Sequence, residues 1–213
     1  MREIIYGTGN AAKIAYMERA LERLPLRMIG LKAAAKAKGI LLPEIEETGN
    51  TPLENARLKA ETYFRLFKSP VFSCDSGLYL WNDLTGELLP EEQQPGICVR
   101  GRGQRRLSDD ELLKHYQGLV KKYGQLRGRY KNAVSLIWNE NIREESMVWG
   151  EPFLFTDIPH RKRVEGFPLD SIALDLKTKK YFYDIEENFQ DKLVSDGSFR
   201  HFFCNFLEKW NLK

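Results

Sequence analysis

The sequence contains few of the residues that mark disulfide scaffolds, zinc clusters or membrane proteins. Its 213 residues include three cysteines and three histidines. Cys74, Cys98 and Cys204 stand at unrelated spacings, which favours neither a disulfide framework nor a zinc site. The sequence also has no bilayer-length apolar run, and its amino terminus shows no signal-peptide pattern. We therefore expect reduced thiols, no membrane association and a cytoplasmic location.

The sequence also lacks a strong charge of one sign and the common nucleotide-binding motifs. Its net charge of +3 is too small to indicate nucleic-acid binding by itself. There is no Walker loop and no dinucleotide fingerprint. The hydrophobic share of 42% and the charged share of 30% are ordinary for a globular protein. At this length we expect a single α/β domain that spans residues 1–213.

The amino terminus is the most informative segment. The apolar run from Ile4 to Tyr6 predicts a strand, and the small polar residues 7–10 predict a tight turn. Asn10 stands at an N-cap position, and Lys13 follows in the first helical turn, where a cation opposes the helix dipole. A bound anion would relieve that conflict, so the pattern favours a phosphate site. A plain strand-to-helix junction with a solvated lysine explains it equally well.

Three further segments have the sequence signals of helix starts. Thr51 with Glu54 and Ser108 with Glu111 have the spacing of capping boxes, and a last helix is expected from near Asp196. Apolar residues then recur at helical spacing. The expected buried positions are Ile14, Met17, Leu21 and Leu24 in the first helix, Leu53, Ala56, Ala60, Phe64 and Phe67 in the second, Leu112, Tyr116, Leu119 and Tyr123 in the third, and Phe199, Phe202, Phe203, Phe206 and Trp210 in the last.

Extended segments are expected between these helices. They are rich in apolar and β-branched residues, and they cover 71–73, 78–81, 133–138, 147–155, 171–176 and 181–183. With a turn at Asn139 and Asn141, their order predicts an α/β fold. We expect a mixed twisted β-sheet flanked by helices, with two lobes around a central substrate cleft. The stretch from Gly86 to Arg106 is expected to be a mobile loop.

Two isolated acidic positions complete the candidate chemistry. Glu47 lies in the loop before the predicted helix at Thr51, and Asp75 lies between two predicted strands. Carboxylates beside a cationic phosphate turn are suited to magnesium, which protein side chains share with substrate phosphates. The pattern therefore predicts metal-assisted phosphoryl chemistry. The ordinary alternatives are a solvated glutamate in a loop and an aspartate that favours a turn.

Five segments resemble the inosine triphosphate pyrophosphatases, which act on non-canonical purine nucleoside triphosphates. They stand in the family's order: TGNAAK at 8–13, EETGNTPLENARLKA at 46–60, DSGL at 75–78, PG at 95–96 and GFPLDS at 166–171. The resemblance implies that water attacks the α-phosphorus of ITP, dITP or XTP, with Mg²⁺ as cofactor. The products would be pyrophosphate and a nucleoside monophosphate. A homodimer is implied as well.

The resemblance also implies roles for individual residues. Asp75 would orient or deprotonate the attacking water, and together with Glu47 it would bind Mg²⁺. Phe167 would stack on the purine, and Asp170 would hydrogen-bond to the purine edge. Arg200 would reach the ligand from the start of the last helix. The residues that would hold the phosphates are Thr8, Gly9, Asn10, Lys13 and Ser76, and Lys13 would also stabilise the transition state.

The sequence departs from the family pattern at several positions. Cys74 stands where many members have an acid, which removes a candidate metal ligand. In the purine segment a glycine and a tyrosine are replaced by Pro168 and Leu169. Near the carboxyl terminus Phe199 replaces a histidine, and the nearest counterpart of a family lysine is Lys192. These changes affect base binding more than phosphate chemistry.

Two other functions fit parts of the sequence. The basic residues Arg100, Arg102, Arg105 and Arg106, with the stretch 160–163, would suit a non-catalytic nucleotide- or RNA-binding protein. Aromatic residues do not alternate with these basic residues, so no stable nucleic-acid complex is expected. The other alternative is a related pyrophosphatase that acts on other nucleoside triphosphates. A panel of substrates distinguishes the three.

Overall fold

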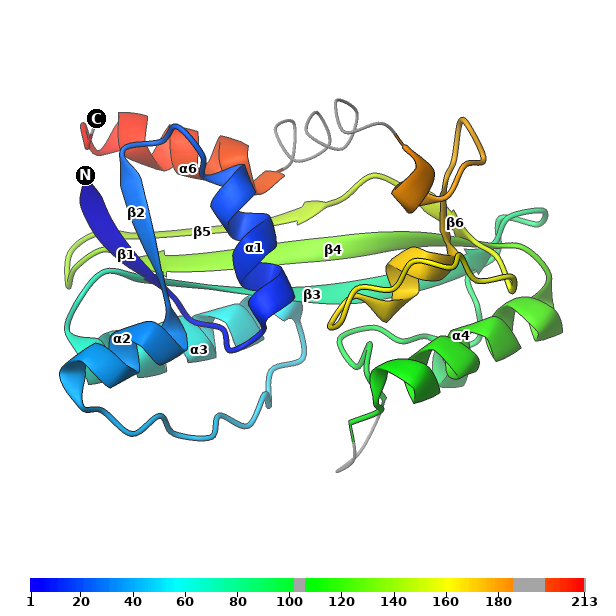
Figure 1. Ribbon diagram of the computed structural model, residues 1–213, viewed down its shortest axis with the longest axis horizontal. Helices are drawn as coiled ribbons and strands as arrows, with labels where there is room; N and C mark the ends of the chain where they lie inside the picture. The colour runs from blue at the N-terminus through cyan, green and yellow to red at the C-terminus, as the bar shows by residue number, and fades with distance from the viewer. Residues whose placement is uncertain (102–105, 186–197, 213) are drawn as a thin grey trace. The chain divides into compact units, whose positions relative to one another are not determined.

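The computed structural model describes residues 1–101, 106–185 and 198–212 (Figure 1). The chain divides into two compact units. Unit 1 contains Met1–Ser76, Asn132–Val148 and the described carboxy-terminal residues, and unit 2 contains Gly77–Lys131 and 149–185 as far as they are described. The boundaries fall inside strands β3 (Val71–Asn82), β4 (Leu126–Ile137) and β5 (Arg143–Trp149). The single domain expected for the whole chain stays a prediction.

The described strands form a seven-stranded mixed sheet in the order β2-β1-β3-β4-β6-β7, and β5 pairs with β4. Strand β1 (Arg2–Tyr6) is parallel to β2 (Leu26–Gly30) and to β3. Strand β6 (Phe153–Phe155) is antiparallel to β4 and to β7 (Ala173–Asp175). Strand β5 covers Arg143–Trp149. This twisted mixed sheet with its flanking helices confirms the predicted α/β class.

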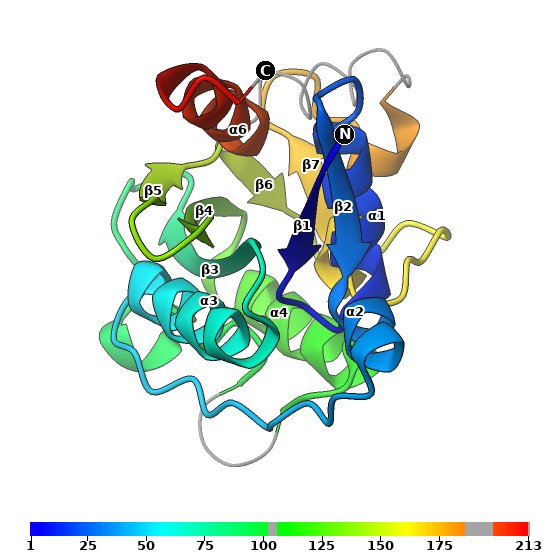
Figure 2. The same cartoon turned by 90° about the vertical axis from the view of Figure 1, so that its left-hand side faces the viewer.

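In unit 1, helices cover both faces of the strands. Helices α2 (Leu31–Lys38) and α3 (Pro52–Phe67) lie on one side, and α6 (Ser198–Lys209) lies on the other (Figure 2). Helix α1 (Ala11–Ala20) shares a core with α6. That core confirms the predicted phenylalanine stripe, because Phe202, Phe203 and Phe206 are buried and Phe199 packs against them. Asp196, where this helix was expected to begin, lies outside the described residues.

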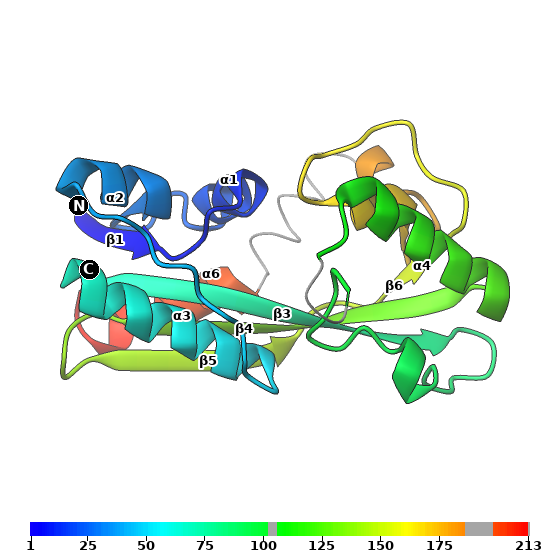
Figure 3. The same cartoon turned by 90° about the horizontal axis from the view of Figure 1, so that it is seen from below.

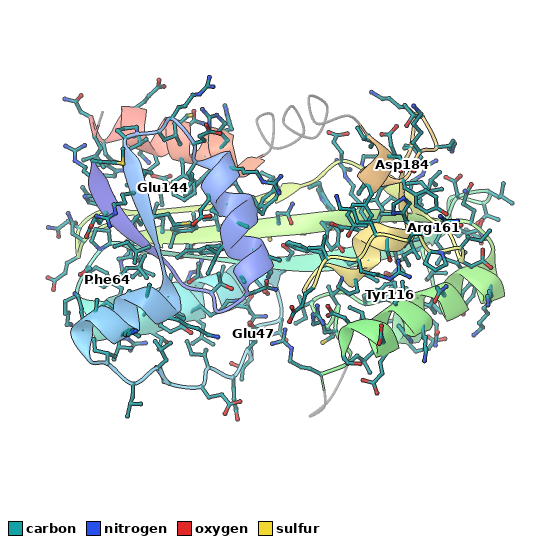
Figure 4. The ribbon with its side chains drawn as sticks, viewed as in Figure 1. Glu47, Phe64, Tyr116, Glu144, Arg161 and Asp184 are labelled. Atoms are coloured by element: carbon teal, nitrogen blue, oxygen red, sulfur yellow. The ribbon has the colours of Figure 1, made fainter. Side chains whose placement is uncertain are left out.

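In unit 2, helix α4 (Asp109–Tyr123) packs on the strands. Tyr116, which is labelled in Figure 4, is 1% exposed, and its ring lies 5.7 Å from that of Phe155. Three short 3₁₀ helices complete the unit: η1 (Glu91–Gln93), η2 (Pro168–Ile172) and η3 (Phe182–Asp184). Among the described residues, no helix combines the length and the apolar character that a membrane crossing needs.

The helix starts follow their local sequence signals closely. Asn10 caps α1, and Ser108 forms the predicted capping box with Glu111 at the start of α4. At α3 the prediction was only half right. The Thr51 side chain accepts from the Glu54 backbone N–H as expected, but the Glu54 carboxylate accepts from the N–H of Asn50 at 2.8 Å instead of closing on Thr51.

The prediction of two short strands around Asp75 was wrong. Residues 71–82 form one continuous strand, so the DSGL segment is extended and is not a turn. The physical reason is tertiary: the Asp75 side chain finds partners on α3, and the Ser76 hydroxyl donates to Asn132 on β4 at 2.8 Å. Neither side chain needs the local backbone contacts that favour turns.

Several other boundaries also differ from the predictions. The segment 147–155 is two strands, because the chain leaves the sheet after Trp149 and Pro152 lacks a backbone donor. The segment 181–183 was expected to be extended but mostly belongs to η3, and 171–176 is divided between η2 and β7. Helix α1 ends at Ala20, before Leu24, and β2 and α2 were not predicted.

The predicted turn between β4 and β5 is confirmed, with the Asn139 side chain accepting from the backbone N–H groups of Asn141 and Ile142.

The turn after β1 depends on a close approach at Gly7. A Cβ atom at Gly7 would lie 2.1 Å from the Ser73 hydroxyl and 2.8 Å from the Tyr63 ring. We expect Gly7→Ala to destabilise the protein by about 1–3 kcal/mol, because it overpacks a buried contact. Equilibrium unfolding in urea measures the loss.

Gly9→Ala is the matched control. Its Cβ would meet only the Lys32 side chain, at an ordinary distance of 3.7 Å. Its effect should stay within about 0.5 kcal/mol. Equal losses in the two variants would contradict the close-approach argument at Gly7.

Candidate active site

The turn between β1 and α1 has the form of a phosphate cradle. The Asn10 side-chain oxygen accepts from the backbone N–H groups of Ala12 (2.9 Å) and Lys13 (3.2 Å), and the Asn10 N–H lies 3.3 Å from the Thr8 hydroxyl. The Thr8 N–H donates to the Tyr6 carbonyl at 2.7 Å. Gly9 is exposed at the tip of this turn. Four of the five predicted phosphate residues, all except Ser76, therefore lie together at one helix N-terminus, which is where anions are stabilised.

The two predicted carboxylates meet on a lysine. The Lys59 ammonium on α3 lies 2.8 Å from the Glu47 carboxylate and 3.1 Å from that of Asp75. Glu47 stands on the loop before α3 (Figure 4), and Asp75 projects from β3, alongside which α3 runs (Figure 3). The Lys59 and Asp75 side chains are only 12% and 11% exposed. The structure thus brings Glu47 and Asp75 together, as the sequence predicted.

Asn55 fixes the orientation of the Asp75 carboxyl group. It is 2% exposed, and its amide N–H lies 3.3 Å from one Asp75 oxygen while Lys59 contacts the other oxygen. Its own side-chain oxygen accepts from the Gly49 N–H at 2.8 Å. Gly49 cannot have a side chain here, since a Cβ atom would lie 2.6 Å from that oxygen. One buried amide therefore ties the acidic loop to the candidate catalytic residue.

Two lysines, Lys13 and Lys59, supply the positive charge at this end of unit 1. Burial and the neighbouring Lys59 ammonium lower the pKa of Lys13, against the opposing effect of Asp75. Burial also acts on Lys59, but there the Asp75 and Glu47 carboxylates prevail and raise its pKa. Lys13 is thus the less well compensated cation, which is the situation that a bound anion would relieve.

The residues on either side of Asp75 have different roles. Cys74 lies 7% exposed in the core, and burial raises the pKa of its thiol to about 12. A neutral thiol is a poor ligand for a hard cation, so this position supplies no charge to the site. The Ser76 hydroxyl donates its proton to the Asn132 side-chain oxygen, so in this arrangement the Ser76 hydroxyl oxygen can only accept further hydrogen bonds.

The purine-binding candidates lie in unit 2, at the start of η2. Gly166 has a left-handed backbone with φ of +85°, and Phe167 follows as the N-cap residue of η2. The Asp170 N–H lies 3.3 Å from the Phe167 carbonyl. Burial raises the pKa of Asp170 to about 6. Phe167 and Asp170 thus belong to one short turn.

Arg200 is not brought to the other candidates of unit 1. Its guanidinium donates to the carbonyls of Ala20 (2.9 Å) and Glu22 (2.8 Å), at the carboxyl end of α1. The phosphate turn lies at the opposite end of that helix. Arg200 therefore satisfies helix-end carbonyls, and it would have to leave them to contact a ligand. Lys192 lies outside the described residues.

Sequence reasoning did not assign Lys59 a role and left the role of Asn55 open. Both stand inside the EETGNTPLENARLKA segment, one helical turn apart on α3. That four-residue spacing places them on one face of the helix, next to the glutamate that the same segment supplies. The spacing was a usable signal, but only the fold shows that β3 brings Asp75 to the same face.

The residues fit a shared divalent cation and do not fit a closed metal cage. Within the described residues, no group of three or more acidic, histidine or cysteine side chains could hold an ion. The carboxylates of Glu47 and Asp75 both contact the ammonium of Lys59, so they lie close enough together to share one cation. Magnesium is commonly held by one or two carboxylates and completed by water and substrate phosphates.

The raised pKa of Asp170 predicts an unusual pH dependence of stability. Between pH 3.8, the ordinary value, and about 6, the folded protein keeps a proton that the unfolded chain has lost. The contribution of Asp170 to stability should therefore fall as pH rises through this window. Urea unfolding across the window should show that Asp170→Asn removes this dependence.

Asp175, in the same unit, provides the matched control of opposite sign. Burial acts to raise its pKa, but hydrogen bonds from Thr178 and Lys177 outweigh that effect and lower it. Asp175→Asn should therefore remove stability that the wild type gains as pH rises. If the pH profile of stability were the same in Asp170→Asn as in the wild type, the Asp170 carboxyl group would not be the cause of the pH dependence.

Comparison with known proteins gives independent support to this reading. The model of the Ham1 family matches residues 4–172. The chain is 39% identical to the dITP/XTP pyrophosphatase of Halalkalibacterium halodurans over 216 aligned residues, which cover 99% of each protein. It is 31% identical to the dITP/XTP pyrophosphatase of Bacillus subtilis over 154 residues, which cover 70% of this chain and 71% of that one.

Solved structures agree on the fold. The HAM1 protein from Coxiella burnetii matches with a TM-score of 0.70 at 20% identity, covering 98% of this chain and 100% of its own. The Staphylococcus aureus Ham1 protein matches with a TM-score of 0.64 at 22% identity, covering 95% and 98%. With the family model matching most of the sequence and one relative aligning over nearly its full length, this chain belongs to the Ham1 family.

Proposed function

We propose that this protein hydrolyses non-canonical purine nucleoside triphosphates, such as ITP, dITP and XTP, to the monophosphate and pyrophosphate. The observation that carries the proposal is the meeting of Glu47 and Asp75 on Lys59, in the same unit as the phosphate turn that contains Lys13. Two relatives that are 39% and 31% identical to this chain, over 216 and 154 aligned residues, bear the name dITP/XTP pyrophosphatase.

The triphosphate binds to the turn after β1. The positive end of the α1 helix dipole and the ammonium of Lys13 supply positive charge to the phosphate oxygens. Thr8 and Asn10 add polar contacts, and Gly9 lets the backbone come close. The Ser76 hydroxyl would have to release Asn132 before it could donate to a phosphate. As negative charge moves to the pyrophosphate leaving group, Lys13 stabilises it.

Asp75 is the general base. Its carboxylate takes a proton from the water that attacks the α-phosphorus, while the Asn55 amide and the Lys59 ammonium hold its two oxygens. A carboxylate with both oxygens fixed presents one defined direction to the water, which reduces the entropic cost of the attack.

Mg²⁺ is the proposed cofactor, and Glu47 and Asp75 are the residues that would hold it. Bound there, the ion would neutralise phosphate charge and polarise the phosphoryl group under attack. Lys59 would still neutralise part of the negative charge of these carboxylates, and Cys74 would contribute no ligand. The affinity for the ion therefore depends on phosphates that arrive with the substrate.

The purine is recognised by the turn at the start of η2. Phe167 stacks on the base, and the Asp170 carboxylate, ionised above pH about 6, accepts a hydrogen bond from the N1–H of hypoxanthine or xanthine. Adenine has no N1–H and would place a lone pair against that carboxylate. An unpaired buried polar group costs about 1–3 kcal/mol, which sets the scale of discrimination.

The basic residues give little support to the alternative of an RNA-binding protein. Arg100 forms an ion pair with Asp109 at 2.7 Å, and His160 lies 3.2 Å from Asp184. Arg102 and Arg105 lie outside the described residues. A pyrophosphatase for other nucleoside triphosphates remains the competing enzyme function. The homodimer, the cytoplasmic location and the cleft between two lobes stay predictions.

A substrate panel tests the proposal directly. With Mg²⁺ present, pyrophosphate release from dITP and XTP should exceed release from dATP by roughly 10- to 100-fold in kcat/KM, because only the oxopurines match Asp170. dGTP and a pyrimidine triphosphate complete the panel. Equal turnover of all substrates, or a preference for the pyrimidine, would reject the proposed substrate class.

Asp75→Asn tests the mechanism. The variant keeps the size of the side chain and its contact with Asn55 but cannot take a proton, so kcat for dITP should fall by roughly 100- to 10,000-fold. Glu54→Gln is the control, because Glu54 is an acid of the same segment whose carboxylate accepts from the Asn50 N–H. Near-normal turnover by Asp75→Asn would move the role of base to another group.

A further inference from the structure

An ion pair in unit 2 holds both backbone groups of a single glycine. The Arg100 guanidinium lies 2.7 Å from the Asp109 carboxylate. The other Asp109 oxygen accepts from the Gly166 N–H at 2.7 Å, and Arg100 donates to the Gly166 carbonyl at 3.2 Å. The three residues come from segments 57 and 66 positions apart in the chain, so only the fold brings them together.

The surroundings make this pair stronger than an ordinary surface ion pair. The Arg100 and Asp109 side chains are 24% and 34% exposed. Burial acts to raise the pKa of Asp109, but the Gly166 N–H and the Arg100 guanidinium outweigh it and lower the pKa. Charge-assisted hydrogen bonds of this kind are shorter and stronger than neutral ones. The pair is therefore a fixed point of the unit.

Both partners are anchored to rigid structure. Asp109 is the first residue of α4, and Ser108 before it is fixed by its capping box with Glu111. The Arg100 carbonyl accepts from the Leu107 N–H at 2.9 Å, and the preceding residue, Val99, accepts from the buried Tyr116 of α4 at 3.1 Å. The ion pair thus fixes the Gly166 peptide relative to helix α4.

Gly166 in turn sets the course of the purine segment. Its φ of +85° belongs to the left-handed region, where a small error in one dihedral redirects the following residues. Phe167 comes directly after it as the N-cap of η2, and Asp170 closes on the Phe167 carbonyl. A displaced Gly166 would therefore move the stacking ring and the carboxyl group together.

We propose that Arg100 and Asp109 are positioning residues for base recognition: by clamping both sides of the Gly166 peptide they hold Phe167 and Asp170 in place for the purine. The inference rests on the proposed function, because it names what orients the base-binding residues of that same site. It also gives a role to Arg100, the first arginine of the basic cluster, which has no part in the proposed phosphate binding or catalysis. The pair does not itself touch substrate.

The chain contains a matched control pair. Arg127 and Asp83 form an ion pair in the same unit, with guanidinium-to-carboxylate distances of 2.6 and 2.9 Å, and neither contacts the Gly166 peptide. Arg127→Ala removes a comparable ion pair without affecting the purine segment. Any loss that it shares with Arg100→Ala reports general destabilisation.

Kinetics with and without a base test the proposal. Arg100→Ala should raise KM for dITP roughly 10-fold with kcat within about twofold, the scale of a lost charge-assisted hydrogen bond that acts on binding. Hydrolysis of deoxyribose 5′-triphosphate, which has no base, should stay unchanged. Arg100→Lys should recover part of the loss, and Arg127→Ala should leave both substrates unaffected. Equal losses on dITP and the baseless triphosphate would overturn the proposal.

Hydrogen exchange of the free protein provides a readout that needs no turnover. In Asp109→Ala the Gly166 amide loses its acceptor, so its exchange should accelerate roughly 10-fold or more, while amides in the middle of α4 keep their protection. Unchanged exchange at Gly166 would show that the pair does not hold the peptide. If the wild type hydrolyses no triphosphate, the proposed function fails, and the exchange result alone then decides whether the clamp exists.

Discussion

The buried contact between Lys59 and the carboxylates of Glu47 and Asp75 is the interaction on which this site depends. Asp75 is 8% exposed, and a cation and hydrogen bonds offset the cost of burying a carboxylate at that depth. Lys59 supplies the cation, and Asn55 supplies the hydrogen bond. Removing either would leave an incompletely compensated charge on the strand that would activate water. The folded state and the proposed catalytic step therefore both depend on Asn55 and Lys59 of α3.

The local parts of this architecture could be read from the sequence. The Asn10 cap, the Ser108 capping box and the Asn139 turn depend on side chains that bond to backbone two or three residues away, so nearby residue types determine them. The continuous strand through Asp75 could not be predicted in this way. Aspartate, serine and glycine in succession favour a turn, and only distant partners, Asn55 and Asn132, make the extended form preferable.

The same distinction separates the site residues that were predicted from those that were missed. Glu47 and Asp75 were predicted because acidic residues in loops and at strand ends suggest metal chemistry, whatever they contact. Lys59 and Arg100 gained their roles through partners 16 and 9 residues away, across a helix-to-strand contact and a loop closure. Arg200 shows the reverse case: the family resemblance implied a contact with the ligand, and the fold places its guanidinium on the carbonyls that end α1, so its ligand role stays a prediction.

The neutral thiol at Cys74 changes the charge balance of the site. With an acid there, three carboxylates would face Lys13 and Lys59; here Glu47 and Asp75 face the same two cations, and the formal charges cancel. A balanced site attracts a free divalent cation less strongly than one with excess negative charge. Under the proposed function, the phosphates of the substrate would then supply more of the negative charge that holds the ion. Metal binding and substrate binding would therefore be more tightly coupled in this chain than with a third carboxylate.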